Sequence, residues 1–183
     1  MEEIKGITTI EKDSFCVQQQ NRIIRDTIEL INKKELNILQ LGCNFIENSL
    51  LLTKNEKYKI ILIDDKNETI NSDKLNISKS SLTKTNFEDN TFDLTFNIDV
   101  INKTQDPLNI IKEMVRITRK YGMILLIFPG DFDIKKVIKD ININLIDVKI
   151  PNLDAKLAEY GNFKTSKNPL SKSGKNYLIM FKV

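Results

Sequence analysis

The sequence of 183 residues contains no histidine and only two cysteines, Cys16 and Cys43. Without histidine the chain cannot form a Ser-His-Asp or Cys-His catalytic site, a histidine metal site, or the usual proton carrier near neutral pH. Two cysteines are too few for a disulfide framework, so we expect both to be reduced thiols. Any chemistry must therefore work without imidazole, and no metal site is expected.

Long apolar runs and a strong net charge are also missing. Residues 1–6 are acidic and lack the apolar region of a signal peptide, and no apolar run approaches the roughly 20 residues of a membrane span. The formal net charge is +3, from 28 basic and 25 acidic residues that are intermixed along the chain. Such a chain has no strong field to gather nucleic acid or an anionic membrane. We expect a cytoplasmic protein whose partner is a small-molecule substrate or another protein.

Amphipathic segments alternate with short apolar segments along the chain. The amphipathic segments predict helices over residues 17–32, 47–52, 107–120 and 131–140, and a short polar helix over 67–70. Apolar segments predict strands over residues 36–42, 57–65, 75–78, 91–97, 123–128, 141–150 and 175–183. This alternation predicts an α/β fold: a Rossmann-like, doubly wound, mostly parallel seven-stranded sheet with helices on both faces. Glu113 and Arg116, three residues apart, predict a surface ion pair.

The length predicts one domain over residues 1–183, because the chain is too short for two ordinary domains. Within it we expect an N-terminal helical segment over 1–34, a core over 35–150, an insertion over 151–174 and a last strand over 175–183. The insertion is polar, is too long for a plain hairpin, and is expected to hold a short helix over 153–160.

Three of the predicted strands end in segments that suit ligand binding. In a doubly wound sheet, ligands bind beyond the carboxyl ends of the strands, where glycine turns allow close approach and helix N-termini offer N–H groups. The three segments are residues 40–46 (QLGCNFI), residues 63–65 (IDD), and residues 80–82 (SSL) with the run 86–93 (NFEDNTFD) that follows.

From residue 37 to residue 129 the sequence resembles the class I S-adenosylmethionine-dependent methyltransferases of the type 11 kind. The match is strongest over residues 87–97 (FEDNTFDLTFN), then the Asp-Pro at 106–107, then residues 112–129 (KEMVRITRKYGMILLIFP). In the family these pieces read approximately PFxDxSFDxV, a connecting DP, and xExxRVLKPGG, in the same order. The resemblance implies a Rossmann-like fold and S-adenosylmethionine as cofactor.

The resemblance also implies a cofactor loop over residues 40–46, where the family has acid-x-Gly-x-Gly-x-Gly. Gly42 matches the first glycine and is expected to form the tight turn under the methionine moiety, whereas Gln40 stands at the position of the acid. Asn44 replaces the second glycine and is expected to keep the turn, because Asn tolerates a positive φ. Ile46 replaces the third glycine and fills the space that glycine leaves, since a β-branched residue cannot comfortably adopt a positive φ.

Other cofactor contacts follow from the same resemblance. Asp64 aligns with the acid that pairs with the ribose hydroxyls, and Asp65 lies next to it as a second contact or a helix cap. Ser81 stands where the family often has an acid against the adenine amine, and Leu82 is expected beside the adenine ring. Asn97 is expected on the substrate side, beyond the strand over 91–97.

The function implied is methyl transfer from S-adenosylmethionine to a small acceptor. The sulfonium makes the methyl group electrophilic, so the protein mainly aligns the acceptor, with Asp99 and Asp131 as candidate proton acceptors. The alternative is a catalytically inactive methyltransferase-like domain that serves as a binding or regulatory partner of another protein, because the loop departs from the family at three positions. A nicotinamide-linked dehydrogenase fits poorly, since it would need a better glycine fingerprint.

Overall fold

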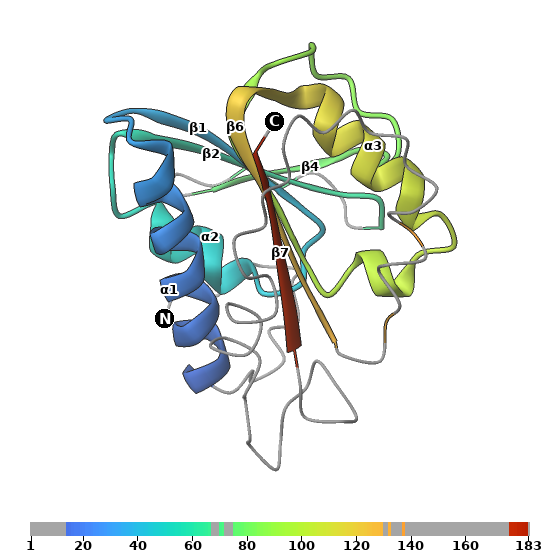
Figure 1. The fold of residues 1–183 in the computed structure, drawn as a ribbon, viewed down its shortest axis with the longest axis horizontal. Coiled ribbons are helices and arrows are strands. Elements are labelled where there is room, and N and C mark those ends of the chain that lie inside the picture. The colour runs from blue at the N-terminus through green and yellow to red at the C-terminus, as the bar shows by residue number, and fades with distance from the viewer. Residues whose placement is uncertain are drawn as a thin grey trace.

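In the computed structural model of the chain, residues 14–66, 70–71, 75–129, 132, 137 and 176–182 are described. In chain order they form α1 (Ser14–Ile31), β1 (Leu36–Leu41), α2 (Ile46–Leu52), β2 (Tyr58–Asp64), β3 (Ile70–Asn71), β4 (Asn76–Lys79), β5 (Phe92–Ile98), the 3-10 helix η1 (Ile101–Lys103), α3 (Pro107–Ile117), β6 (Thr118–Pro129) and β7 (Asn176–Lys182). Figure 1 shows these elements as one sheet between two layers of helix.

The strands of the described residues form one seven-stranded sheet in the order β3-β4-β2-β1-β5-β6-β7. The five central strands, from β4 to β6, are parallel to one another, whereas β3 at one edge and β7 at the other run antiparallel to their neighbours. The predicted Rossmann-like, doubly wound α/β fold is therefore confirmed, and the predicted last strand over 175–183 is observed as β7.

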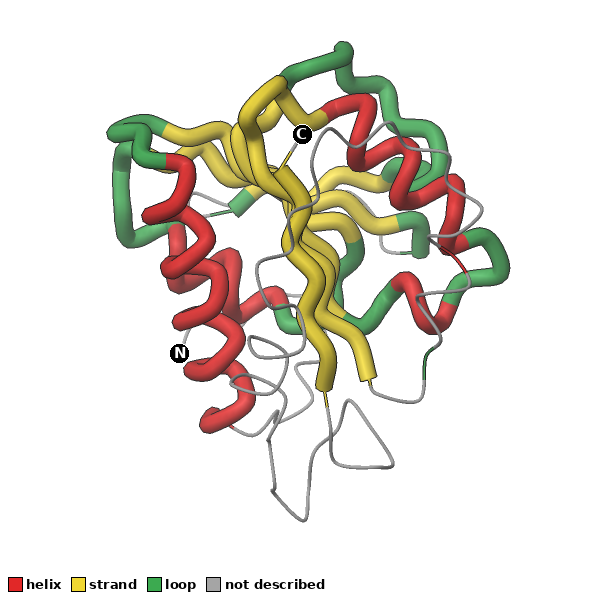
Figure 2. Tube along the Cα trace, viewed as in Figure 1, coloured by secondary structure: helices red, strands yellow, loops and turns green. Residues whose placement is uncertain are grey.

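Helices cover both faces of the sheet, with α1 and α2 on one face and α3 on the other (Figures 1 and 2). The strands are apolar on both faces for this reason. In β6, Leu125 and Ile127 belong to the hydrophobic core under α1 and α2. Their neighbours Leu126 and Phe128 belong to the core under α3. The uninterrupted apolar run of β6 is thus explained by alternate burial on two sides.

The helix predicted over 107–120 is shorter than expected, because α3 ends at Ile117 and Thr118 already belongs to β6. Thr118 pairs with Phe92 of β5, and its hydroxyl donates to the Met114 carbonyl at 2.6 Å. Tyr121 has a positive φ of 66°, which no helix continues through. The strand pairing with β5 therefore overrides the helical pattern of residues 118–120.

The polar helix predicted over 67–70 is also wrong at its end, since Ile70 and Asn71 form β3 and pair with β4. Residues 67–69 lie outside the described residues. The same holds, apart from residues 132 and 137, for the helix predicted over 131–140, the strand over 141–150, and the insertion over 151–174 with its short helix. The division of the chain into these parts stays a prediction.

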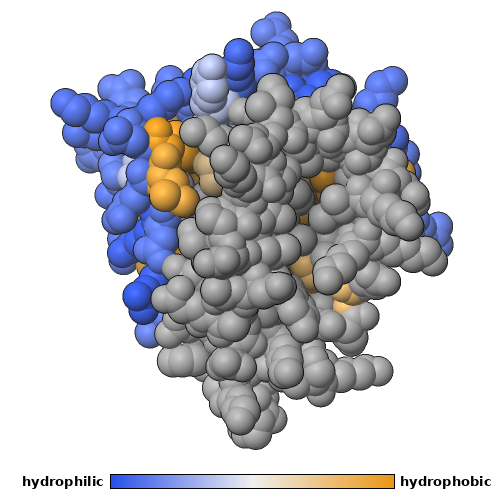
Figure 3. Space-filling model, viewed as in Figure 1, coloured by the Kyte–Doolittle hydropathy of each residue, from blue (hydrophilic) through white to orange (hydrophobic). Residues whose placement is uncertain are grey.

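The described surface is mostly hydrophilic on the side shown in Figure 3. Two large hydrophobic side chains among the described residues are exposed, Leu30 at 58% and Tyr121 at 65%. No helix in the described ranges is long and apolar enough to cross a bilayer.

A buried carboxylate joins three elements at the end of the sheet where β1 and β5 begin. Asp93 is 2% exposed and accepts hydrogen bonds from the Asn37 backbone N–H at 2.9 Å, from Lys33 Nζ at 2.7 Å and from Arg119 Nη1 at 3.1 Å. Burial raises the pKa of Asp93, but the hydrogen bonds from Asn37 and Lys33 and the charge of Arg119 outweigh it and lower the pKa overall. Asp93 is therefore an ionised structural group.

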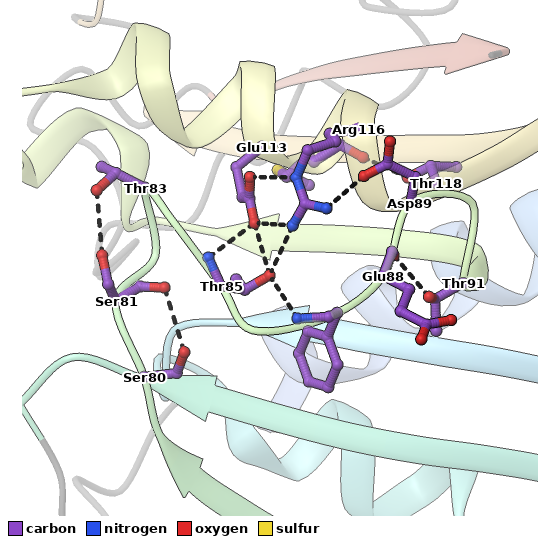
Figure 4. A network of polar contacts seen from close by, with 12 residues as sticks. Ser80, Ser81, Thr83, Thr85, Glu88, Asp89, Thr91, Glu113, Arg116 and Thr118 are labelled. Atoms are coloured by element: carbon purple, nitrogen blue, oxygen red, sulfur yellow. Dashed lines mark hydrogen bonds and ion pairs between the residues drawn. The ribbon is translucent and has the colours of Figure 1, made fainter.

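A second buried carboxylate fixes the loop between β4 and β5 to α3 (Figure 4). Glu113 is 6% exposed and accepts from the backbone N–H and the hydroxyl of Thr85, at 2.7 and 2.6 Å. Arg116 donates to Glu113 through Nε and Nη2, at 2.9 and 2.6 Å, and to Asp89 through Nη1 at 2.5 Å. The pair expected at the surface thus forms, but its acid is buried and anchors the loop.

This network predicts a pH-dependent stability. Burial raises the pKa of Glu113, but the hydrogen bonds from Arg116 and Thr85 lower it from 4.5 to about 2. Because the pKa is lower in the folded state, the stabilisation is complete above pH 4.5 and is lost as the pH falls toward 2. We expect Glu113→Gln to reduce the free energy of unfolding at pH 7 by roughly 2 to 3 kcal/mol.

Urea denaturation of wild type and Glu113→Gln at pH 7, 5, 4 and 3 measures this difference in the free energy of unfolding. The difference between the two proteins is expected to shrink as the pH falls below 4.5, whereas the exposed change Glu56→Gln should have little effect at any pH. A difference that stays constant down to pH 3 would contradict the role of the ionised carboxylate.

Candidate functional site

The carboxyl ends of β1, β2 and β5 lie next to one another in the middle of the sheet. From β1 the chain continues to β2 and β4 on one side and then returns to β5 on the other side. The point between β1 and β5 is therefore the topological switch point, where open α/β sheets bind their ligands. The structure brings most of the predicted site residues to these strand ends: Gln40, Gly42, Asn44, Asp64, Asp65, Asn97 and Asp99.

Glycine is required at position 42 for two reasons. Its φ is +89°, which a residue with a side chain rarely adopts, and a Cβ at this position would lie 2.4 Å from Val100 Cγ2. The Gly42 N–H donates to the Ile63 carbonyl at 2.7 Å, which ties the turn to β2. The tight turn expected at Gly42 is present, and the space beside it is filled by a side chain of this protein.

The remaining loop residues differ from the expectation. Asn44 does not have a positive φ; the left-handed residue is Phe45, with a φ of 57°. Such a conformation costs a non-glycine residue roughly 1 to 2 kcal/mol. The Phe45 ring is 2% exposed in the core under α1 and α2, and its burial offsets this cost. Ile46 begins α2 and is buried, so it fills its space as predicted without adopting a positive φ.

Gln40 supports the loop from inside the core. Its side chain is fully buried, and Nε2 donates to the carbonyls of Gly42 at 2.9 Å and Asn44 at 2.8 Å. Oε1 accepts from the Ser49 hydroxyl at 2.5 Å. A carboxylate has no hydrogen to give to these two carbonyls, so the glutamine is matched to the loop as it is folded here.

Asp64 ends β2 and lies beside the same loop. Its side chain is 8% exposed; Oδ2 accepts from the Cys43 N–H at 2.7 Å and Oδ1 from the Lys66 N–H at 2.8 Å. A carboxylate can accept about four hydrogen bonds, which suits a group that holds backbone and a ligand together. Its neighbour Asp65 is exposed.

The loop after β5 faces the loop after β1 and is bonded to it. Asn44 Nδ2 donates to the Asp99 carbonyl at 2.6 Å. Asn97 is fully buried; its Nδ2 donates to the Leu41 carbonyl at 2.8 Å and its Oδ1 accepts from the Ile101 N–H at 3.2 Å. Asn97 thus joins β5 to β1, and its expected contact with a cofactor stays a prediction.

The Asp99 side chain is engaged within its own loop. It is almost fully buried, accepts from Asn102 Nδ2 at 2.8 Å and forms an ion pair with Lys103. The spacing of Asp99 and Lys103 is that of an i,i+4 pair, a signal that sequence reasoning could have used. The other predicted proton acceptor, Asp131, lies outside the described residues.

Ser81 and Leu82 follow β4, on the far side of β2 from the switch point. Ser81 is exposed, with its hydroxyl 3.1 Å from that of Thr83 (Figure 4). Leu82 is 5% exposed in the core under α3. The Ser80 N–H donates to the Asp64 carbonyl at 2.9 Å, so this loop begins next to Asp64. No group of cysteine, aspartate and glutamate side chains within the described ranges could hold a metal ion.

Comparison with known proteins agrees with this architecture. The family model for the methyltransferase domain matches residues 39–126. No curated protein matches the chain.

Several solved structures share the fold. They include the YcgJ protein of Bacillus subtilis (16% identity, TM-score 0.53, covering 62% of this chain and 53% of that one) and a putative sarcosine dimethylglycine methyltransferase of Galdieria sulphuraria (13%, 0.52, 69% and 52%). A third is a SAM-dependent methyltransferase of Aquifex aeolicus (14%, 0.50, 71% and 88%). The chain spans about half the length of the first two.

Identities of 13 to 16% establish the fold alone, and the sequence match over residues 39–126 adds the family. Residues 39–126 therefore match the methyltransferase domain family, within a fold that this chain shares with S-adenosylmethionine-dependent methyltransferases.

Proposed function

We propose that this chain binds S-adenosylmethionine and transfers its methyl group to a small-molecule acceptor. The observation that carries the proposal is the position of Asp64, a buried carboxylate at the end of β2 whose Oδ2 lies 2.7 Å from the Cys43 N–H in the loop after β1. Within a methyltransferase domain, a carboxylate at this place suits the two ribose hydroxyls of the cofactor.

The residues at the nucleoside end suit the cofactor. Asp64 would hold the ribose, with Asp65 beside it, while Ser81 and Leu82 follow the neighbouring strand, where the adenine would lie. Leu82 is buried and apolar, and Ser81 offers an exposed hydroxyl. At the methionine end, Gly42 gives the turn that the family requires, but the Asn44 side chain crosses to Asp99 and would have to turn aside.

The bound cofactor supplies an electrophilic methyl group on its sulfonium, so the main task of the protein is to align an acceptor. Asp99 is the candidate proton acceptor among the described residues. Its carboxylate is already hydrogen bonded to Asn102 and ion-paired with Lys103, so alignment is the more important contribution. The modest charge of +3 favours a small acceptor over a nucleic acid or an anionic membrane.

A second candidate function is a binding or regulatory domain without methyl transfer. The observation that favours it is the Asn44 bridge, because a side chain stands where the family has glycine. The two candidates differ in one measurable property: the enzyme must bind S-adenosylmethionine, whereas the regulatory domain need not.

Asp64→Ala is expected to lower the affinity for S-adenosylmethionine and S-adenosylhomocysteine at least tenfold in isothermal titration, because the ribose hydroxyls lose their charged acceptor. The exposed change Glu56→Ala is the control and should bind as wild type does.

Asp64→Ala also removes the acceptor of the Cys43 N–H, so a ligand without ribose hydroxyls separates the two effects. Wild type should prefer adenosine to 2′,3′-dideoxyadenosine, and Asp64→Ala should bind both equally. An equal preference in the two proteins would show that Asp64 acts on the loop and not on the ribose. Failure of wild type to bind either methionine-derived ligand would favour the regulatory domain.

Restoring the acid of the family at position 40 is expected to harm this protein. Gln40→Glu would place a carboxylate against the carbonyls of Gly42 and Asn44, and should lower the free energy of unfolding by about 2 to 4 kcal/mol. Chemical denaturation at neutral pH measures the change, with Gln105→Glu, an exposed position, as the matched control. Unchanged stability would mean that the loop carbonyls turn away from residue 40 at little cost.

A further inference from the structure

The loops after β1 and β5 meet across the switch point through two contacts. Asn44 Nδ2 donates to the Asp99 carbonyl at 2.6 Å, and the Val100 side chain lies so close to Gly42 that a Cβ on residue 42 would be 2.4 Å from Val100 Cγ2. One contact is polar and the other apolar. Together these contacts join the two loops between which an open α/β sheet binds its ligands.

The Asn44–Asp99 hydrogen bond, called the bridge below, is held in place on both sides. The Asn44 carbonyl accepts from Gln40 Nε2 at 2.8 Å, which fixes the backbone from which the Asn44 side chain extends. On the other side, the Asp99 N–H donates to the Ile127 carbonyl at 2.8 Å, and the Asp99 carboxylate is held by Asn102 and Lys103. The bridge therefore joins two anchored loops.

The position of the bridge determines which part of a ligand meets it. Neighbouring strands are about 4.8 Å apart, so a ribose held by Asp64 at the end of β2 lies about two strand spacings from β5. A substituent on the 5′ carbon that reaches β5 has to pass over the end of β1, where Asn44 bonds to Asp99. A nucleoside with only a hydroxyl at this carbon is short enough to stay on the β2 side.

We propose that Asn44 and Val100 set the affinity of this site for the amino-acid end of its ligand. The site holds adenosine-type nucleosides at little cost, and it admits a homocysteine or methionine tail only when the Asn44–Asp99 hydrogen bond breaks. The inference rests on the proposed function, since it takes Asp64 as the ribose contact. In this proposal, Asn44 and Val100 make the site discriminate between ligands that share the same nucleoside.

Isothermal titration with adenosine and with S-adenosylhomocysteine tests the inference. In Asn44→Ala the affinity for S-adenosylhomocysteine should rise about three- to tenfold, because one hydrogen bond no longer has to be broken, while the affinity for adenosine stays within about twofold. Val100→Ala should act in the same direction. Asn109→Ala, which removes an exposed hydrogen bond to Asp106 at 2.7 Å, is the matched control and should change neither affinity.

Each other outcome has a definite meaning, once thermal melting has shown that the variants are folded. Unchanged or weaker binding of S-adenosylhomocysteine by both variants would overturn the inference and leave the proposed function standing. An equal gain for both ligands would also overturn it, since the bridge would then act on the whole site. If none of the four proteins binds S-adenosylhomocysteine, it is the proposed function that fails.

Discussion

The fully buried amide of Gln40 is the interaction on which the rest of the site depends. Its two donated hydrogen bonds turn the carbonyls of Gly42 and Asn44 toward the core, and its oxygen is held by Ser49 of α2. With these carbonyls turned inward, the Cys43 N–H meets Asp64 and the Asn44 side chain reaches Asp99. One side chain thus organises the ends of three strands.

The proposed function and the altered loop are compatible because, in the proposed binding mode, they concern different ends of the same ligand. Asp64 keeps a buried carboxylate beside β1, which is what a ribose requires. The proposed effect of Asn44 and Val100 concerns the other end, beside the loop in which the family has glycines. A methyltransferase domain can keep its nucleoside contacts while its response to the rest of the cofactor is altered.

Sequence reasoning predicted β1, β2, β4 and β5 within one residue at each end, because buried parallel strands are short apolar runs that end at turns. It predicted the apolar run 123–128 of β6 but not its first five residues, 118–122. It extended α3 to residue 120 because nothing local shows that Thr118 pairs with Phe92. The turn at Gly42 and the position of Asp64 at the end of β2 were predicted from their places in a motif. The left-handed Phe45 and the Asn44–Asp99 bond were not, since the first depends on a buried ring and the second joins residues 55 positions apart.

The contacts of the buried Asp93 carboxylate affect how the domain opens in local fluctuations. Its carboxylate is shared by Lys33, Asn37 and Arg119, which come from the connection after α1, from β1 and from the start of β6. A local fluctuation that carried Lys33 away with α1 would leave a buried negative charge with one of its two cations. Such partial opening is costly, so α1 and the central strands should exchange their amide hydrogens as a single cooperative unit.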